Sequence, residues 1–230
     1  MVVTPEASAF SQNGYWIEPA VFTKLECDTL IGRLSDLRSD KRVGGRRNLM
    51  RCKAVKKFAE DSRLLDLALR LTGKSMLPYK ATLFEKTEQA NWLVAFHQDT
   101  ALPVEKTPSG EGWGSPSLKQ GVAFAHAPTA VLTRILELRI HLDNSTLSNG
   151  PLRVIPGSHQ MRWLTDAEFQ AAQDATEPIE CTAPRGGVIA MRPLILHASS
   201  KSIKVTPRRV LHIEYAESLN LAKGIRLAIA

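Results

Sequence analysis

The chain has 230 residues, of which 43% are hydrophobic and 23% are charged, proportions typical of a soluble globular protein. This length favours one domain, residues 1–230, with a sizeable core. No stretch of 18 apolar residues occurs, and MVVTPEASAF lacks a basic segment followed by an apolar one, so neither a membrane span nor a signal peptide is expected. Three cysteines without CxxC spacing argue against a disulfide framework or a cysteine-rich zinc site, and they favour the reducing cytoplasm.

The net charge of +7 is uneven, because basic residues crowd between positions 41 and 57. They are Lys41, Arg42, Arg46, Arg47, Arg51, Lys53, Lys56 and Lys57. The stretch is either a solvated basic surface or a region that attracts an anionic substrate or nucleic acid. No aromatic residue interleaves with these charges before Phe58, so a base-stacking surface, and with it a nucleic-acid partner, is not expected.

The first part of the chain, residues 1–78, is predicted to be mainly helical. Thr23 and Glu26 have the spacing of a capping box, in which each side chain satisfies a free backbone N–H of the first turn. A second helix is predicted over 61–72, with leucines on one face and Gly73 at its end.

From residue 79 the sequence changes to short apolar runs divided by Gly, Pro and Asn, which predicts strands. The expected strands are 79–86, 91–97, 132–142, 151–155, 187–196 and 208–216, and another capped helix is expected to start at Thr165 with Glu168. Segment 103–121 contains four glycines and three prolines, and is interpreted as an active-site loop. The expected fold is mainly β with flanking helices, an antiparallel sandwich or barrel of the jelly-roll type.

One pair of residues with metal-ligand chemistry follows an apolar strand. His97 and Asp99 are two positions apart, so in an extended chain they point to the same side and can bind one ion. His197 ends another apolar run and offers a second imidazole. Two histidines and one carboxylate on one face of a metal leave positions open, as in non-haem iron(II) oxygenases. An HxD pair alone is a weak signal, so the assignment depends on the C-terminal half of the chain.

That half contains Arg208, eleven positions after His197. A planar guanidinium on the next strand can bind the distal carboxylate of a 2-oxo diacid through two hydrogen bonds. Alternation along the strand places Arg208, His212 and Glu214 on one face and Arg209 on the other. If the polar face lines the cavity, Arg208 is the anchor; Arg209 is the alternative.

The chain resembles the phytanoyl-CoA dioxygenase family of iron(II)- and 2-oxoglutarate-dependent oxygenases over nearly its whole length. The segments concerned are GYWIEPAVFTKLECDTL, NWLVAFHQDT, LRIHLDNSTLSNGPLRVIPGSH, MRPLILHASSKS and PRRVLHIEYA. The resemblance implies a double-stranded β-helix, a cupin-like jelly roll over residues 79–217 with helices on one side. It also implies Fe(II), 2-oxoglutarate and O2 as cofactor and cosubstrates, with His97, Asp99 and His197 as iron ligands. Arg208 matches the family's arginine for the 2-oxoglutarate C5 carboxylate, and Ser199 can assist it.

Other polar residues are weaker candidates for the site. Lys86 is placed to reach 2-oxoglutarate, although such a lysine is more often solvent-facing. Arg139 and His141 share one face of a strand and are candidate substrate contacts, with a core role for His141 equally open. His126 and Trp113 are candidate substrate contacts beside or within the 103–121 loop. Trp92, Trp163 and Phe96 are expected in the core, and Ser158 and His159 are expected to cap a turn.

The implied reaction converts 2-oxoglutarate to succinate and hydroxylates an unactivated C–H bond of a small-molecule metabolite. The carboxylate of Asp99 favours hydroxylation, since related halogenases lack it; desaturation and ring closure remain open. Three alternatives are an oxygenase acting on nucleic acid or protein, a non-catalytic cupin-like metal-binding module, and a zinc hydrolase. The short N-terminal region favours a small metabolite over an acyl-CoA. The sequence identifies neither the substrate nor the oligomeric state.

Overall fold

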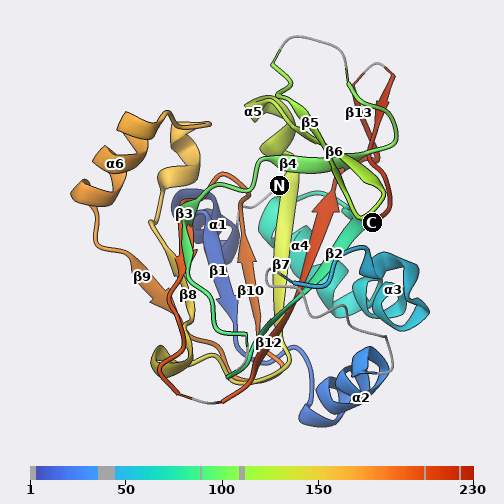
Figure 1. Ribbon diagram of the computed structural model, residues 1–230, viewed down its shortest axis with the longest axis vertical. Coiled ribbons are helices and arrows are strands. Elements are labelled where there is room, and N and C mark those ends of the chain that lie inside the picture. The colour runs from blue at the N-terminus through green and yellow to red at the C-terminus, as the bar shows by residue number, and fades with distance from the viewer. Residues whose placement is uncertain (1–3, 36–44, 89, 109–111, 205, 223) are drawn as a thin grey trace.

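Two facing antiparallel sheets form the centre of the computed structural model, which describes residues 4–35, 45–88, 90–108, 112–204, 206–222 and 224–230 (Figure 1). The larger sheet has the strand order β1-β10-β7-β12-β2 and the smaller one β3-β11-β8-β9. Four helices, α1 to α4, cover the outer side of the larger sheet. This arrangement is the jelly roll with flanking helices that the sequence predicts.

The larger sheet consists of β1 (Tyr15–Glu18), β10 (Val188–Met191), β7 (Ile135–His141), β12 (Arg208–Ala216) and β2 (Leu77–Lys86). The smaller sheet consists of β3 (Val94–His97), β11 (His197–Ser199), β8 (Leu152–Val154) and β9 (Ile179–Cys181). A three-stranded sheet contains β4 (Ala101–Val104), β6 (Val122–His126) and β5 (Pro116–Lys119), and β13 (Asn220–Ala222) pairs with β14 (Ile225–Arg226). The helices are α1 (Pro5–Asn13), α2 (Lys24–Ser35), α3 (Lys53–Ala59), α4 (Ser62–Thr72), α5 (Thr129–Leu132) and α6 (Asp166–Ala175).

Strand alternation divides the larger sheet into an apolar outer face and a polar inner face. On β7, Leu136 and Leu138 pack in the main core together with Leu64 and Leu67 of α4. The intervening residues of β7 point to the other side, because successive side chains of a strand alternate. Every residue of β7 is buried, so the polar side chains on its inner face lie inside the molecule. The helices therefore stabilise one face of the sheet and leave the other for chemistry.

The helix boundaries follow the capping signals in the sequence. The Thr23 backbone N–H donates to Glu26 at 2.7 Å and the Glu26 N–H donates to the Thr23 hydroxyl at 3.2 Å, so the predicted capping box is confirmed. The Thr165 box at the start of α6 is confirmed as well. The helix predicted over 61–72 is α4, which ends at Gly73 with φ +70°. Among the described residues, no helix has the length and apolar character needed to cross a membrane.

Segment 103–121 is only partly the loop that was expected. Its first residues complete β4, and Pro116–Lys119 form strand β5 at the edge of the three-stranded sheet. β5 turns into β6 through Gln120 and Gly121, whose φ angles of +50° and +77° are those of a type I′ hairpin turn. The expectation was wrong here because Gln-Gly replaces the usual Asn-Gly signal and Pro116 occupies the edge, where a missing N–H is tolerated. Residues 109–111 lie outside the described residues.

The single strand predicted over 187–196 is two short strands in different sheets. β10 ends at Met191, and β11 begins at His197 in the smaller sheet. Pro193 lies between them, and its lack of an N–H is incompatible with a continuous central strand. The chain therefore crosses from one sheet to the other just before His197.

The N-terminal part is mainly helical, as predicted, but it also contributes a strand. β1 pairs antiparallel with β10, with Tyr15 opposite Met191, and so forms an edge of the larger sheet. β2 begins at Leu77, and β13 and β14 lie beyond residue 217, so sheet structure extends past both predicted limits of the β region.

Candidate functional site

Three side chains with metal-ligand chemistry meet where strands β3 and β11 of the smaller sheet pair. His97 ends β3 and lies directly opposite His197, the first residue of β11. Asp99 follows β3, and its backbone N–H donates to the Pro193 carbonyl at 2.8 Å. Between the two, Gln98 points elsewhere and donates to the Leu194 carbonyl at 2.7 Å. The pairing of two distant strands thus brings together the three residues singled out in the sequence.

The geometry of this group suits one divalent cation. Asp99 Oδ1 is 3.7 Å from His97 Nε2, and Asp99 Oδ2 is 3.5 Å from His197 Nε2. The candidate ligand atoms of the three residues all lie within 4.8 Å of one another. His97 Nδ1 is 2.9 Å from the Ala95 carbonyl and His197 Nδ1 is 3.0 Å from the Ile195 carbonyl. Because a carbonyl only accepts, each Nδ1 carries the proton and each Nε2 lone pair is free for a metal.

The protonation states also favour metal binding. Burial, reinforced by His197, lowers the pKa of His97, so its imidazole is neutral near pH 7. Burial opposes ionisation of Asp99, but hydrogen bonding and attraction from His197, with His97 beside it, outweigh burial and hold the pKa of Asp99 well below its ordinary value. A neutral imidazole and an ionised carboxylate are the forms that coordinate metal.

A second set of candidate ligand atoms shares Asp99 but fits a cation less well. Asp99, Glu137 and His212 also lie within 4.8 Å of one another. Arg139 donates to His212 Nδ1 at 3.0 Å, so the ring proton of His212 must reside on Nε2, the nitrogen that faces Glu137 and Glu214. Burial and the neighbouring carboxylates raise the pKa of Glu137, which therefore keeps its proton. His212 therefore turns an N–H toward this position, and Glu137 is an uncharged carboxyl group. Neither is in the form that coordinates a metal ion.

A cavity of about 90 Å³ connects the first group to a cluster of buried cations on the larger sheet. Its lining includes His97, Asp99, His197, Lys86, Arg139, Ser199 and Arg208. The Arg208 side chain lies on the inner face of β12 and is 3% exposed. Burial, together with the nearby Arg139, lowers the pKa of Arg208 to about 9. Among the described residues, Arg208 and Lys86 form no salt bridge with a carboxylate, so their charges are costly to bury.

Hydrogen bonds fix the orientation of these cations. Arg208 Nε donates to the Asn149 carbonyl at 3.2 Å, and a terminal nitrogen of Arg208 donates to the Ser199 hydroxyl at 3.2 Å. Lys86 Nζ donates to the same hydroxyl at 2.8 Å. The other terminal nitrogen of Arg208 is buried without a hydrogen-bond partner among the described residues. The cavity therefore presents an unsatisfied guanidinium N–H, as a carboxylate site requires.

Arg209, the alternative anchor, has a different environment. It points away from the cavity and donates to both carboxylate oxygens of Asp143, at 2.8 Å each. Its guanidinium is therefore already paired. Of the two arginines, only Arg208 lines the cavity of the metal-ligand group.

Of the four candidate substrate contacts, two lie near the metal-ligand group and two lie apart from it. Arg139 lines the same cavity, and His126 lines a second cavity whose lining also includes Asp99. His141 is fully buried, and neither of its ring nitrogens has a hydrogen-bond partner among the described residues. Trp113 packs partly buried against a separate apolar cluster around Leu102. The structure thus does not bring His141 or Trp113 to the metal-ligand group.

Several expectations about solvent exposure were wrong. For Lys86 two readings were open, and the solvent-facing one is wrong: the side chain is buried on the inner face of β2, where it lines the cavity. Trp92, expected in the core, lines the cavity of the metal-ligand group. Trp163 is 41% exposed and stacks on His126, while Phe96 packs against an apolar cluster as expected. The Ser158 hydroxyl bridges the Ile155 carbonyl and the Leu196 N–H at 2.6 and 2.8 Å, in agreement with a role in the turn.

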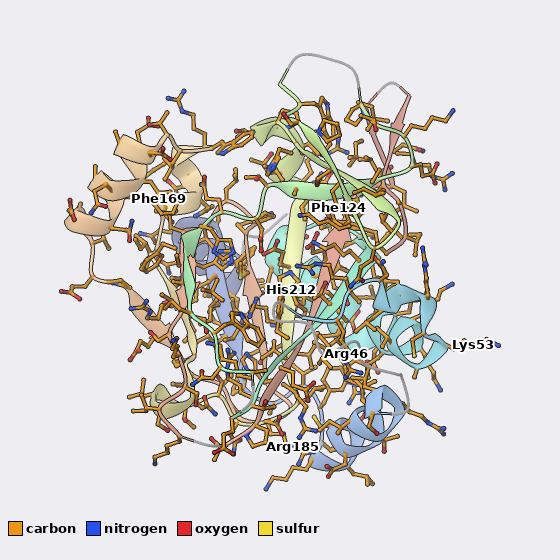
Figure 2. All side chains as sticks on the ribbon, in the orientation of Figure 1. Arg46, Lys53, Phe124, Phe169, Arg185 and His212 are labelled. Carbon is orange, nitrogen blue, oxygen red and sulfur yellow. The ribbon has the colours of Figure 1, made fainter. Side chains whose placement is uncertain are left out.

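The second cavity, of about 250 Å³, contains polar residues that the sequence analysis did not identify as site residues. It is lined by Arg47, Lys80, Thr82, Phe84, Gln98, Asp99, Thr100, Ala101, Lys119, Phe124, His126, His212 and Glu214. Figure 2 shows His212 near the centre of the molecule, with Phe124 above it. Polar residues at alternate positions of β2, Lys80 and Thr82, are a signal that could have indicated this lining.

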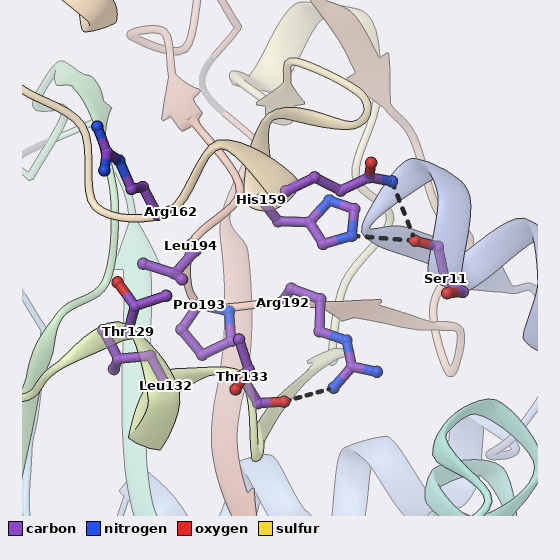
Figure 3. Close-up of a pocket in the computed structure, with 10 residues that line it drawn as sticks. Ser11, Thr129, Leu132, Thr133, His159, Arg162, Arg192, Pro193 and Leu194 are labelled. Carbon is purple, nitrogen blue, oxygen red and sulfur yellow. Dashed lines mark hydrogen bonds between the residues drawn. The ribbon is translucent and has the colours of Figure 1, made fainter.

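A larger hollow of about 520 Å³ has a different set of lining residues (Figure 3). Its lining includes His159, which bonds to the Ser11 carbonyl at 3.1 Å, and Arg192, which donates to the Thr133 carbonyl at 3.3 Å. None of the three metal-ligand residues is part of this lining. His97 and His197 line the cavity of about 90 Å³, and Asp99 lines both this cavity and the one of about 250 Å³.

The sequence model of the phytanoyl-CoA dioxygenase family matches residues 10–210. No curated protein sequence matches the chain.

Several solved structures share the fold. EctD from S. alaskensis with 2-oxoglutarate and 5-hydroxyectoine has a TM-score of 0.69 at 20% identity, over 94% of this chain and 76% of its own. The α-ketoglutarate-dependent epimerase SnoN from nogalamycin biosynthesis has a TM-score of 0.67 at 16% identity, over 93% and 81%. The carbocyclase SnoK from the same biosynthesis has a TM-score of 0.69 at 14% identity, over 94% and 84%.

Gly150→Ala tests how strictly the Asn149–Gly150 turn positions the cations. Gly150 has φ +69°, and an added Cβ would lie 2.2 Å from the Ser200 carbonyl oxygen and 3.1 Å from Lys86 Nζ. The left-handed conformation alone costs about 1–2 kcal/mol for a residue with a Cβ. We expect a lower thermal unfolding midpoint. The control is Gly32→Ala on α2, which has open space around it and should be neutral or stabilising. Equal midpoints for the two variants would contradict the packing described.

Proposed function

The chain belongs to the phytanoyl-CoA dioxygenase family of iron(II)- and 2-oxoglutarate-dependent oxygenases, and we propose that it hydroxylates an unactivated C–H bond of a small metabolite. In this proposal His97, Asp99 and His197 hold the iron. Arg208, assisted by Ser199 and Lys86, binds the C5 carboxylate of 2-oxoglutarate.

The observation that carries the proposal is the unsatisfied guanidinium N–H of Arg208, buried in the same cavity as the metal-ligand group. A binding module that only holds a metal has no use for a buried cation beside it, and neither does a zinc hydrolase. A dicarboxylate with one end at the metal and the other at Arg208 explains both features. The donor set of two neutral imidazoles and one carboxylate fits iron(II) with open positions.

Iron(II) with 2-oxoglutarate and O2 supplies the oxidation of a C–H bond, while 2-oxoglutarate becomes succinate and carbon dioxide. The chain's own residues do the positioning. The backbone carbonyls of Ala95 and Ile195 hold the two imidazoles in one orientation. Arg208 and Lys86 provide positive charge at the far end of the cavity, and Ser199 holds them together. Asp99 stands between this cavity and the second one, so a substrate in the second cavity lies next to the metal site.

The decisive experiment measures succinate formed from 2-oxoglutarate by protein purified without oxygen and loaded with Fe(II), in a screen of small metabolites. We expect one class of metabolite to stimulate succinate formation at least tenfold over the uncoupled background. His97→Ala should abolish both iron binding and the stimulated turnover, while His159→Ala, a histidine of the hollow shown in Figure 3, should retain both. Iron binding that is unchanged in His97→Ala would contradict the proposal.

Arg208→Gln and Arg209→Gln separate the two candidate anchors. Loss of charge-assisted hydrogen bonds to a buried carboxylate costs about 1.5–3 kcal/mol, so the KM for 2-oxoglutarate should rise about 10- to 100-fold in Arg208→Gln. Arg209→Gln removes a partly exposed ion pair with Asp143 and should change this KM by less than about twofold. A larger rise in KM in Arg209→Gln than in Arg208→Gln would reverse the assignment.

The lowered pKa of Lys86 leads us to expect that 2-oxoglutarate binding depends on pH. Burial, reinforced by Arg208, Arg139 and Arg153, lowers the pKa of Lys86 to about 7. Below this pH the ammonium is charged and attracts the carboxylate, whereas above it binding must also take up a proton. The Kd for 2-oxoglutarate should therefore increase as the pH rises through about 7, by up to about tenfold per unit. Anaerobic binding assays from pH 6 to 9 should show this increase in the wild type and a flatter profile in Lys86→Gln.

A further inference from the structure

The second cavity contains more positive charge than its carboxylates neutralise. Three cations line it, Arg47, Lys80 and Lys119, and it contains two carboxylates, Asp99 and Glu214. Asp99 belongs to the metal-ligand group. The cavity volume of about 250 Å³ lies just below the range of typical small-molecule sites, about 300–1,000 Å³. The cavity therefore suits a compact ligand and carries an excess of positive charge.

Lys80 does not contribute to this excess. Its ammonium pairs with Glu214 Oε1, and Tyr79 donates to the other oxygen of the same carboxylate at 2.6 Å. Attraction from Glu214 raises the pKa of Lys80 in spite of its burial. Lys80 and the buried Glu214 thus form a neutral pair that lines the wall of the cavity.

Arg47 and Lys119 have no such partner. Neither forms a salt bridge with any carboxylate of the described residues. Lys119 Nζ lies 5.0 Å from the centre of the Phe124 ring. Burial lowers the pKa of Lys119, and the positive charges of Lys80 and Arg47 lower it further. Asp99 and Glu214 attract Lys119 as well, but neither forms a salt bridge with it. Two neighbouring cations that have no salt-bridge partner among the described residues create a positive potential that favours an anion.

The backbone holds Arg47 at this place. The preceding residue, Arg46, exchanges two backbone hydrogen bonds with Leu83 of β2, both 2.9 Å long. The following residue, Asn48, donates from its side chain to the Gln120 carbonyl at 3.3 Å, in the turn next to Lys119. Arg47 is thus fixed between β2 and the β5–β6 hairpin. Of the basic stretch 41–57, Arg47 is the residue that lines the cavity, while Lys41 and Arg42 lie outside the described residues.

We propose that Arg47 and Lys119 bind an oxyanion group, a carboxylate or a phosphate, of the metabolite that is oxidised at the neighbouring metal site. This assignment of a substrate class rests on the proposed function. The anionic group supplies the charge that the two cations lack. The body of the metabolite then occupies the cavity, whose lining includes Phe84 and Phe124, and its far end reaches the metal-ligand residue Asp99.

The test is a titration of metal-free protein with inorganic phosphate, with acetate, and with acetamide as the neutral counterpart of acetate, followed by amide chemical shifts. The amides of Gln120 and Gly121 report on the second cavity, and those of Asn149 and Gly150 report on the Arg208 site. We expect saturable shifts at Gln120 and Gly121 with phosphate or acetate and none with acetamide. Whichever anion binds more tightly identifies the oxyanion as phosphate or carboxylate.

The double variant Arg47→Gln/Lys119→Gln should raise the Kd for the bound anion, phosphate or acetate, by about tenfold or more, because it removes both charge-assisted contacts. The matched control Lys53→Gln/Lys57→Gln removes the same charge from exposed positions of α3, where Lys53 projects away from the body of the molecule (Figure 2). Its Kd should stay within about twofold of the wild type. The single variants Arg47→Gln and Lys119→Gln should each show an intermediate weakening.

The proposal is overturned if Gln120 and Gly121 do not respond to either anion, if acetamide binds as well as acetate, or if the control variant weakens binding as much as the double variant. It is also overturned if the metabolite found in the turnover screen has the same kcat/KM as its neutral amide. Because the titration uses metal-free protein, its result does not depend on turnover. A failure of the oxygenase proposal is therefore distinguishable from a failure of this one.

Discussion

The pairing of β3 with β11 is the constraint on which the candidate site depends. It places His97 opposite His197, although the two residues are a hundred positions apart in the chain. A shift of one residue in this register would turn one imidazole to the other face of the sheet. The register is supported from outside the strands, because the Asp99 N–H donates to the Pro193 carbonyl and the Gln98 side chain donates to the Leu194 carbonyl. These contacts tie the segment before His197 to the segment around Asp99.

The larger sheet supplies the second half of the site by a simple division of its faces. Its outer face packs on α1 to α4 and contains the main apolar core, so the burial that stabilises the fold is concentrated there. Its inner face is then free to hold buried cations and carboxylates, which are costly unless paired. The cost is reduced for two of these cations by partners within the chain: Lys80 forms an ion pair with Glu214, and Arg139 donates a hydrogen bond to His212. Arg208 and Lys86 on this face have no carboxylate partner among the described residues. Arg47 and Lys119, which line the second cavity from outside the larger sheet, have none either, so these two pairs define the proposed ligand positions.

Much of the fold was readable from local signals. The capping boxes at Thr23 and Thr165, the end of α4 at Gly73 and the full length of β12 follow from residue types within a few positions. The exceptions have local causes too. Gln120-Gly121 forms a hairpin turn, but it lacks the Asn-Gly pair by which such a turn is usually predicted. Pro193 interrupts an apolar run that its hydrophobic pattern predicts to be one strand. Strand β1 had no clear signal, since its four residues are all half-buried at a sheet edge.

The sequence by itself predicted the chemistry of the site: the HxD pair, the distant histidine and Arg208 indicated the ligands, and the resemblance over nearly the whole chain indicated the family and its cofactors. It also indicated that Arg208 and His212 share a face, because strand alternation is a local property. The tertiary structure decided which charges are compensated. Asp143 neutralises Arg209, Glu214 neutralises Lys80, and His141 and Trp113 lie apart from the metal-ligand group. Those outcomes depend on which strands and loops become neighbours, and no spacing along the chain encodes the distance between a cation on one element and a carboxylate on another.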